Sequence, residues 1–324
     1  MSAPVEYWWD SAPELVEPQW QTVTTASRLG PFSGVTTNPM LLREAYKRHP
    51  LAGRSRSGWD LYLACGARSA DYLASRRLSI PICIQLDPRS AFDAPAMLRQ
   101  AAEIRDRMPN ATIKVPLTRA GIDIIQALVA ARVSVNATWG FTVAQLATAA
   151  RTIADATDPQ LEGPPSAARP RHVLTLMAGR IGELGLRPHV GHEPRLLRGA
   201  ECVVFEAAYH SLRRYRTATT LLASSLRGGP GADCWHYGAM MDREVIVTLP
   251  PSFLGQQGLP ALDVHYGRID NETRERVTSN GVVRRYVAED GYEPPEFDRL
   301  APLVSTRDEA IHAMEDFENL ASHG

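Results

Sequence analysis

Lysine is rare in this chain, and one of its two lysines lies in an apolar segment. Lys47 and Lys114 are the only lysines among 35 cationic side chains, and the remainder are arginines. Lys114 falls within the apolar run Ala111–Leu117. Arginine is not deprotonated in a protein, whereas a buried lysine loses its proton and then attacks carbonyl groups. The type and position of Lys114 therefore predict a Schiff base with a ketone, whose iminium allows a neighbouring C–C bond to break or form.

Such chemistry needs a proton shuttle and polar groups that orient substrate hydroxyls. Asp10 is the natural shuttle, because a carboxylate can both accept and return a proton. Hydroxyl binding suits three polar residues that end other apolar runs, namely Asn38, Asn136 and Thr138. These groups can serve one reaction only if the fold brings the ends of their runs together.

A second group of residues has the chemistry of an anion site. Arg180, Ser225 and Arg227 follow two successive apolar runs late in the chain. On adjacent strands they could converge on a phosphate through charge-assisted hydrogen bonds. Most arginines here must be solvated surface residues, so the positions of Arg180 and Arg227, and not their type, single them out.

The elements that must position these residues alternate between short apolar runs and longer amphipathic stretches. The predicted strands are Val5–Asp10, Gly34–Thr37, Ile80–Leu86, Thr112–Val115, Val133–Thr138, His172–Leu176, Thr217–Ser224 and Val245–Leu249. The predicted helices are Pro39–Arg48, Trp59–Ser75, Ala91–Arg107, Arg119–Ala131, Thr142–Ala154, Arg198–Arg214, Ala232–Met240 and Ser305–Leu320. Alternation of this kind is typical of parallel βα units, and eight strands predict a closed (β/α)8 barrel of the TIM type. An open doubly wound sheet remains an alternative, although no GxGxxG follows a strand.

We expect a single α/β barrel over residues 1–262 and a C-terminal helical extension over residues 263–324 that packs on the barrel and is not an independent domain. Asp155–Arg171 is rich in Pro, Gly and Ala and predicts a surface insertion. Ser305 is the expected cap of the last helix. In a barrel, polar residues at the carboxyl ends of strands face the active site. The candidates at those ends are Asp10, Thr36, Asn38, Gln85, Lys114, Asn136, Thr138, Thr175, Arg180, Ser225 and Arg227.

Structural roles compete with these functional ones. A lone lysine in an apolar run often extends its amine to water from a barrel edge. Asp10 could cap a following helix, and Thr36–Pro39 could be an ordinary turn at a helix start. These alternatives stay open at the level of single residues.

Composition excludes several classes of partner. The formal net charge is -1, so there is no basic excess to bind nucleic acid or an anionic membrane. The four cysteines are far apart, which argues against a zinc site or a disulfide framework and suits the cytoplasm. The first residues lack the pattern of a signal peptide, and no run of 18 apolar residues is present. We expect no metal and no cofactor, and the sequence is compatible with a homo-oligomer.

Several ordered motifs resemble the transaldolase family. Gly34–Pro39 reads GVTTNP and looks like its TTNP signature, and Ile113–Thr118 resembles its Schiff-base lysine segment. Asn136-Ala137-Thr138, with Phe141-Thr142 and Ala144-Gln145 beyond, resembles the next motif. Ala178–Ile181 and Ala223–Arg227 resemble later ones, and the similarity runs with gaps from about Trp8 to Pro251.

The resemblance implies a class I aldolase-type barrel, a lysine imine on the fourth strand and sugar-phosphate substrates. By position it makes Lys114 the imine former and Asp10 a proton-transfer residue. It makes Thr138 the holder of a catalytic water. The hydroxyl binders would be Asn38 and Asn136, and the phosphate clamp would be Arg180, Ser225 and Arg227.

Departures from the family pattern cluster around the expected reacting carbon. Transaldolases have glutamate where Gln85 stands, and an amide cannot replace it in proton exchange. The related fructose-6-phosphate aldolases also have glutamine there, paired with a tyrosine on strand six, but this chain has Met177. Thr175-Leu176 replaces a usual Ser-Pro, and Met40 replaces a serine. These changes predict a shifted reaction or acceptor.

Three functions follow. The first is a transaldolase-like transferase that moves a dihydroxyacetone unit from a ketose phosphate to an aldehyde acceptor, in the making of an unusual sugar. The second is a simple class I aldolase that cleaves or forms a ketose phosphate, which Gln85 favours. The third is a non-catalytic barrel that binds a sugar phosphate or a protein partner, against which Lys114 and Asp10 argue.

Overall fold

A computed structural model describes residues 5–16, 32–53, 55–157, 170–216, 218–226, 235–240, 243–250 and 269–323. The eight strands form a closed barrel in chain order. They are β1 (Glu6–Asp10), β2 (Gly34–Thr36), β3 (Ile82–Gln85), β4 (Thr112–Pro116), β5 (Val135–Gly140), β6 (His172–Leu176), β7 (Thr219–Ala223) and β8 (Ile246–Leu249). The predicted (β/α)8 class is therefore confirmed, and the open sheet is excluded.

The chain contains two compact units. One comprises Tyr7–Lys114 with 249–259 and 306–324, and it carries β2, β3 and most of β1 and β4. The other comprises 115–248 with 1–6 and 260–305, and it carries β5 to β7 and most of β8. Within each unit the strands pair in parallel with their sequence neighbours.

In its described part, the unit that carries Lys114 contains three α-helices, two 3-10 turns and most of the last helix. They are α2 (Pro39–Arg48), α3 (Gly58–Ser75), α4 (Ala94–Arg107), the 3-10 turns η1 (Pro13–Val16) and η2 (Pro88–Ser90), and α14 (Ala301–His323) from Thr306 on. Side-chain caps begin α2, α3 and α4 at Asn38, Ser57 and Asp93. Because Asp93 accepts the Ala96 N–H, α4 begins at Ala94 and not at the expected Ala91.

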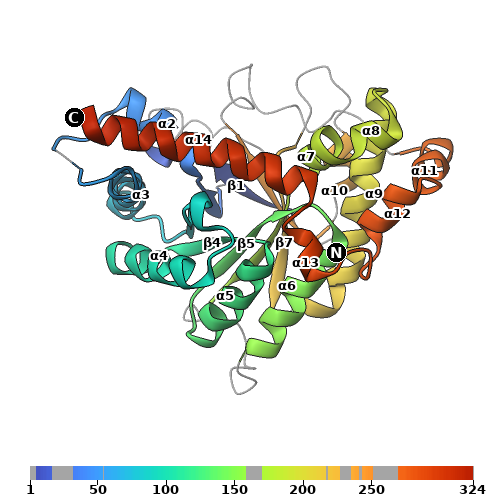
Figure 1. Cartoon of the computed structure of the whole chain (residues 1–324), viewed down its shortest axis with the longest axis horizontal. Coiled ribbons are helices and arrows are strands. Elements are labelled where there is room, and N and C mark those ends of the chain that lie inside the picture. Colours follow the sequence, from blue (N-terminus) through green and yellow to red (C-terminus); the bar gives the residue numbers. More distant parts are fainter. Residues whose placement is uncertain are drawn as a thin grey trace. The chain divides into compact units, whose positions relative to one another are not determined.

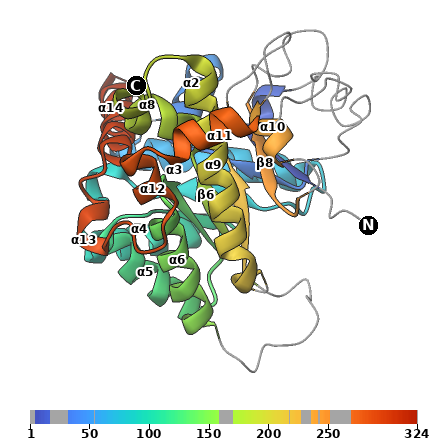
Figure 2. The same cartoon turned by 90° about the vertical axis from the view of Figure 1, so that its right-hand side faces the viewer.

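The second unit is built around a long buried helix, α9 (Pro194–Leu212). Its other helices are α5 (Arg119–Ala130), α6 (Val143–Ala156), α7 (Ala178–Arg180), η4 (Ile181–Leu186, a π-helix), α8 (Arg187–Val190), η5 (Arg213–Tyr215), α10 (Trp235–Met240), α11 (Asn271–Thr278), α12 (Gly281–Val287) and α13 (Pro294–Phe297). Helices α5 and α6 lie side by side on this unit (Figure 1), and α11 and α12 pack on α9 (Figure 2).

The C-terminal region differs from the sequence prediction in two ways. The last helix begins at Ala301, so Ser305 lies inside it and is not its cap. Pro302 in the first turn suits this start, because the early N–H groups of a helix need no partner within it. Helices α11 to α13 occupy a stretch for which the sequence predicted no individual helix, because segments such as Asn271–Thr278 bury few apolar residues and show little helical periodicity.

Two sequence predictions fall wholly or partly outside the described residues. The boundary between residues 262 and 263 lies outside the described residues and stays a prediction. The insertion Asp155–Arg171 is described only at its ends, since residues 158–169 are outside the described part. In the part of the chain that the structure describes, no helix is long and apolar enough to cross a membrane.

Candidate active site

Lys114 is a buried amine on β4. Its Nζ donates to the backbone oxygen of Thr37 over 3.1 Å, and its side chain is almost inaccessible to solvent. Burial lowers the pKa of the Lys114 ammonium, and the negative charge of Asp10 opposes that shift. Desolvation thus increases the share of neutral amine, which is the nucleophilic form.

Asp10 lies at the end of β1, beside the end of β2. The register of β1 and β2 pairs Asp10 with Thr36. The hydroxyl of Thr36 donates to Oδ1 of Asp10 over 2.6 Å. This bond orients the carboxylate, and the electrostatic influence of Asp10 reaches the Lys114 amine.

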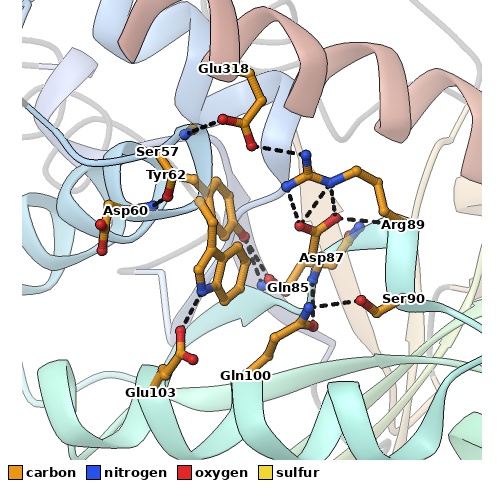
Figure 3. A network of polar contacts seen from close by, with 12 residues as sticks. Ser57, Asp60, Tyr62, Gln85, Asp87, Arg89, Ser90, Gln100, Glu103 and Glu318 are labelled. Carbon is orange, nitrogen blue, oxygen red and sulfur yellow. Dashed lines mark hydrogen bonds and ion pairs between the residues drawn. The ribbon is translucent and has the colours of Figure 1, made fainter. Parts of the chain in front are cut away.

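Gln85 is the last residue of β3, and the register of β3 and β4 places it opposite Lys114. Its side chain is buried. Its backbone N–H and C=O both bond to the phenol oxygen of Tyr62, at 3.0 and 2.9 Å (Figure 3). An amide at this position can donate and accept hydrogen bonds but cannot exchange a proton as a carboxyl group does.

Asn38 has a structural role that the sequence left open. Its Oδ1 accepts the N–H of Leu41 over 3.0 Å and caps α2, whose first residue is Pro39. The TTNP segment is therefore a strand end and helix start, as the alternative interpretation held. This cap fixes the side chain at the point where β2 leaves the barrel.

Asn136, Thr138 and Thr175 lie on β5 and β6 of the other compact unit, and all three are buried. The hydroxyl of Thr175 donates to Oδ1 of Asn136 over 2.7 Å. The backbone oxygen of Thr138 accepts the N–H of Leu117 over 2.7 Å. The structure thus brings Asn136 and Thr175 into direct contact, and it gives the Asn136 amide a fixed orientation.

The residue after Thr138 has a strained backbone. Trp139 has φ of 61°, in the left-handed region that a bulky residue rarely adopts. The Gln145 side chain supports this turn, since Nε2 donates to the backbone oxygens of Leu117 and Trp139 at 2.9 and 3.3 Å. Strain of this kind persists where the surrounding structure enforces it, and it clusters at functional sites.

The predicted phosphate residues lie after β6 and β7. Arg180 ends α7 and is followed by the π-helical turn η4. Ser225 follows β7 and, like Trp139, has a left-handed backbone with φ of 57°. π-Helical turns and strained residues are both common at functional sites. Arg227 lies outside the described residues.

A buried ionic cluster supports the turn after Arg180. Glu201 on α9 is fully buried, and its carboxylate accepts from Arg198 over 2.6 Å and contacts His236 Nε2 at 2.7 Å. A Cβ atom on Gly182 of η4 would lie 1.9 Å from Glu201 Oε1, so any larger residue there would displace the Glu201 carboxylate. Burial raises the pKa of Glu201, and the hydrogen bond from His236 opposes that shift. The sequence prediction missed this cluster and Tyr62, because nothing in residue spacing shows such contacts.

A closed barrel of eight parallel strands with a desolvated lysine on its fourth strand defines a (β/α)8 protein with a candidate amine nucleophile. Residues 17–284 match the model of the Transaldolase/Fructose-6-phosphate aldolase family. The chain belongs to this family.

Curated relatives cover the chain only in part. A transaldolase of Mycolicibacterium smegmatis is 35% identical over 130 residues, which are 34% of this chain and 35% of the relative. A transaldolase of Mycobacterium leprae is 31% identical over 129 residues, 34% of each chain. A transaldolase of Neisseria gonorrhoeae is 27% identical over 215 residues, 60% of each chain. The matched region thus spans about a third of the mycobacterial relatives and 60% of the neisserial one.

Proposed function

We propose that this protein is a transaldolase-like transferase that moves a dihydroxyacetone unit from a ketose phosphate to an aldehyde acceptor. The observation that carries the proposal is the buried Lys114, whose pKa is lowered by desolvation beside Asp10. Family membership supports the same reaction class. The altered residues Gln85, Thr175 and Met177 further suggest an unusual acceptor, as in the synthesis of an uncommon sugar.

The reaction begins with attack of the neutral Lys114 amine on the C2 carbonyl of the donor. Loss of water from the carbinolamine gives an iminium ion. A base then removes the proton of the C4 hydroxyl, the C3–C4 bond breaks, and its electron pair enters the iminium to form an enamine. The aldehyde fragment leaves. The enamine attacks the carbonyl carbon of the acceptor aldehyde, whose oxygen takes up the proton, and hydrolysis of the new imine releases the product.

Each remaining candidate has a proposed role in these steps. Asp10 is the proton shuttle, and Thr36 keeps its carboxylate oriented. Thr138 holds the water of imine formation and hydrolysis, and Gln85 orients it by hydrogen bonds. The residues that bind substrate hydroxyls are Asn38, Asn136 and Thr175, and those that bind the phosphate are Arg180, Ser225 and Arg227.

The chain offers a matched pair of lysines for the test. Incubation with fructose 6-phosphate and borohydride should add a reduced dihydroxyacetone unit to Lys114, which mass spectrometry of a peptide digest would locate. Lys114→Met should abolish the adduct, whereas Lys47→Met, at an exposed lysine on α2, should leave it intact. A wild-type protein that forms no adduct on Lys114 with any ketose phosphate tried would sink the proposal. Tight binding of the sugar phosphate, unchanged in Lys114→Met, would then favour a non-catalytic barrel.

Simple aldol cleavage is a second candidate, and Gln85 is the observation that favours it. With an amide in place of a carboxyl group beside Lys114, the fate of the enamine depends on another proton donor. Protonation of the enamine followed by hydrolysis would release dihydroxyacetone. Turnover of a ketose phosphate without any acceptor aldehyde would establish aldolase action, and an absolute need for the acceptor would exclude it.

A further inference from the structure

Strand β2 ends one hydrogen-bonding position before its neighbour β3. The last backbone N–H and C=O of β3 that face β2 therefore have no partner on that strand. The ladder between them runs as far as the bond from Thr37 N to Cys83 O. The next groups on β3 that face β2 are the N–H and C=O of Gln85, because Leu86 N already bonds to Lys114 O on the β4 side.

β2 cannot continue the ladder to Gln85. In a continued parallel ladder, the backbone N–H of residue 39 would donate to Gln85 O, but residue 39 is a proline and has no N–H. The acceptor due to receive Gln85 N–H is Thr37 O, which instead accepts from Lys114 Nζ at 3.1 Å. Buried N–H and C=O groups without hydrogen-bond partners cost free energy, so another group must bond to the backbone N–H and C=O of Gln85.

Tyr62 of α3 supplies that group. Its phenol oxygen donates to Gln85 O at 2.9 Å and accepts from Gln85 N at 3.0 Å, so one hydroxyl takes the place of the missing strand. The side chain is fully buried, and its ring stacks on Trp59 with centroids 5.3 Å apart. The edge of the ring contacts Phe317 of α14, with centroids 5.8 Å apart.

The last helix also reaches the end of β3 through charged groups (Figure 3). Glu318 accepts from the backbone N–H of Gly58 at 2.7 Å and from Arg89 at 2.9 Å. Arg89 in turn donates to both oxygens of Asp87, two residues beyond Gln85. A Cβ atom on Gly58 would lie 2.4 Å from the Glu318 backbone nitrogen, so the start of α3 is in close contact with α14.

We propose that Tyr62 is a positioning residue for Gln85, and that α14 holds Tyr62 and Asp87 in place through Phe317 and Glu318. The inference rests on the proposed function, since it assigns to Gln85 a role beside the Lys114 amine. In this arrangement the Gln85 peptide is held by α3 and not by β2. The direction of the Gln85 side chain therefore depends on a hydroxyl whose two hydrogen bonds both go to the Gln85 backbone.

The first test needs no activity. Hydrogen exchange of the Gln85 amide should become at least about tenfold faster in Tyr62→Phe, because the phenylalanine ring keeps the packing but offers no acceptor. Tyr286→Phe, at another buried tyrosine, is the matched control and should leave the Gln85 amide unchanged. Unchanged exchange at Gln85 in Tyr62→Phe would overturn the assignment, even if the protein proved not to be an enzyme.

The second test is a double-mutant cycle on turnover. Tyr62→Phe should lower kcat about tenfold with little change in KM, and this loss should shrink to less than about twofold in a Gln85→Ala background. Glu318→Gln, at a partly exposed side chain, should give a smaller loss of kcat that also disappears in Gln85→Ala. If Tyr62→Phe does not fold, Glu318→Gln takes its place in the double-mutant cycle with Gln85→Ala. Equal losses in both backgrounds would mean that these residues act on the fold in general and would refute a positioning role.

The two proposals fail in different ways. Absence of an adduct on Lys114 would refute the proposed chemistry and leave the exchange result standing. A normal adduct with additive losses of kcat would refute the positioning role and leave the chemistry standing.

Discussion

The Gln145 side chain links the turn at residues 139–142 to Leu117, and its replacement should destabilise the barrel strongly. Its Oε1 accepts from the N–H groups of Phe141 and Thr142 at 3.0 and 3.2 Å, and its Nε2 donates to Leu117 O and Trp139 O at 2.9 and 3.3 Å. The side chain is fully buried. An unsatisfied buried group costs about 1–3 kcal/mol, so Gln145→Met, which removes these bonds and the one from the Thr142 hydroxyl, should cost about 4 kcal/mol after partial relaxation. That is a large share of the stability of a typical domain, which is about 5–15 kcal/mol.

Gln145→Glu separates the two halves of this network. A glutamate keeps the acceptor for the N–H groups of Phe141 and Thr142. Its second oxygen, however, would lie next to the backbone oxygens of Leu117 and Trp139, to which it cannot donate when ionised. Burial would raise the pKa of the new carboxyl in the folded state above its unfolded value. Folding would then favour the protonated form, so the stability of this variant should fall as the pH rises from 5 to 8.

Urea denaturation at pH 5 and pH 8, followed by circular dichroism, measures both effects. Gln126→Glu, at an exposed glutamine on α5, controls for the added charge and should change stability by less than about 0.5 kcal/mol. The reasoning would be refuted if Gln145→Met lost less than about 1 kcal/mol, or if the pH dependence of Gln145→Glu matched that of Gln126→Glu.

Three further predictions concern other buried polar groups. Burial lowers the pKa of His172 from 6.5 to about 4, so its contribution to stability is complete above pH 6.5 and is lost as the pH falls toward 4. At pH 5 the loss amounts to about 2 kcal/mol, and denaturation curves of His172→Phe should lack this part of the pH dependence. Thr175→Val keeps the side-chain volume but removes the donor to Asn136, and it should lower stability by about 1 kcal/mol in urea titrations; an unchanged stability would show that this bond contributes little. Glu201→Ala breaks the buried pair with His236 and should cost about 3 kcal/mol in the same assay, and a loss below 1 kcal/mol would show that the pair contributes little.

The barrel was predictable because its strands are short apolar runs with regular spacing. His172–Leu176 was predicted with the observed limits, and the other strands differ by only a few residues at each end. The helix starts that carried clear capping signals, such as Pro39, were also predictable. Asn271–Thr278 was not, because its helix depends on packing of Thr273 and Val277 against other elements, which no local pattern reveals.

Residue types and their positions along the chain identified the candidates for chemistry in this protein. A lysine retained among arginines pointed to Lys114, and the ordered motifs around it indicated the family that the comparison then confirmed. What those residues do in catalysis stays a prediction.

Only the tertiary structure decided how the candidates are held. It showed that the hydroxyl of Thr36 donates a hydrogen bond to Asp10, that of Thr175 to Asn136, and that of Tyr62 to the backbone oxygen of Gln85. The physical reason is that a hydrogen bond depends on distance and direction between two atoms, and these partners are 23 to 39 residues apart in the chain. Sequence determines which groups are available for such bonds, and packing determines which of them meet.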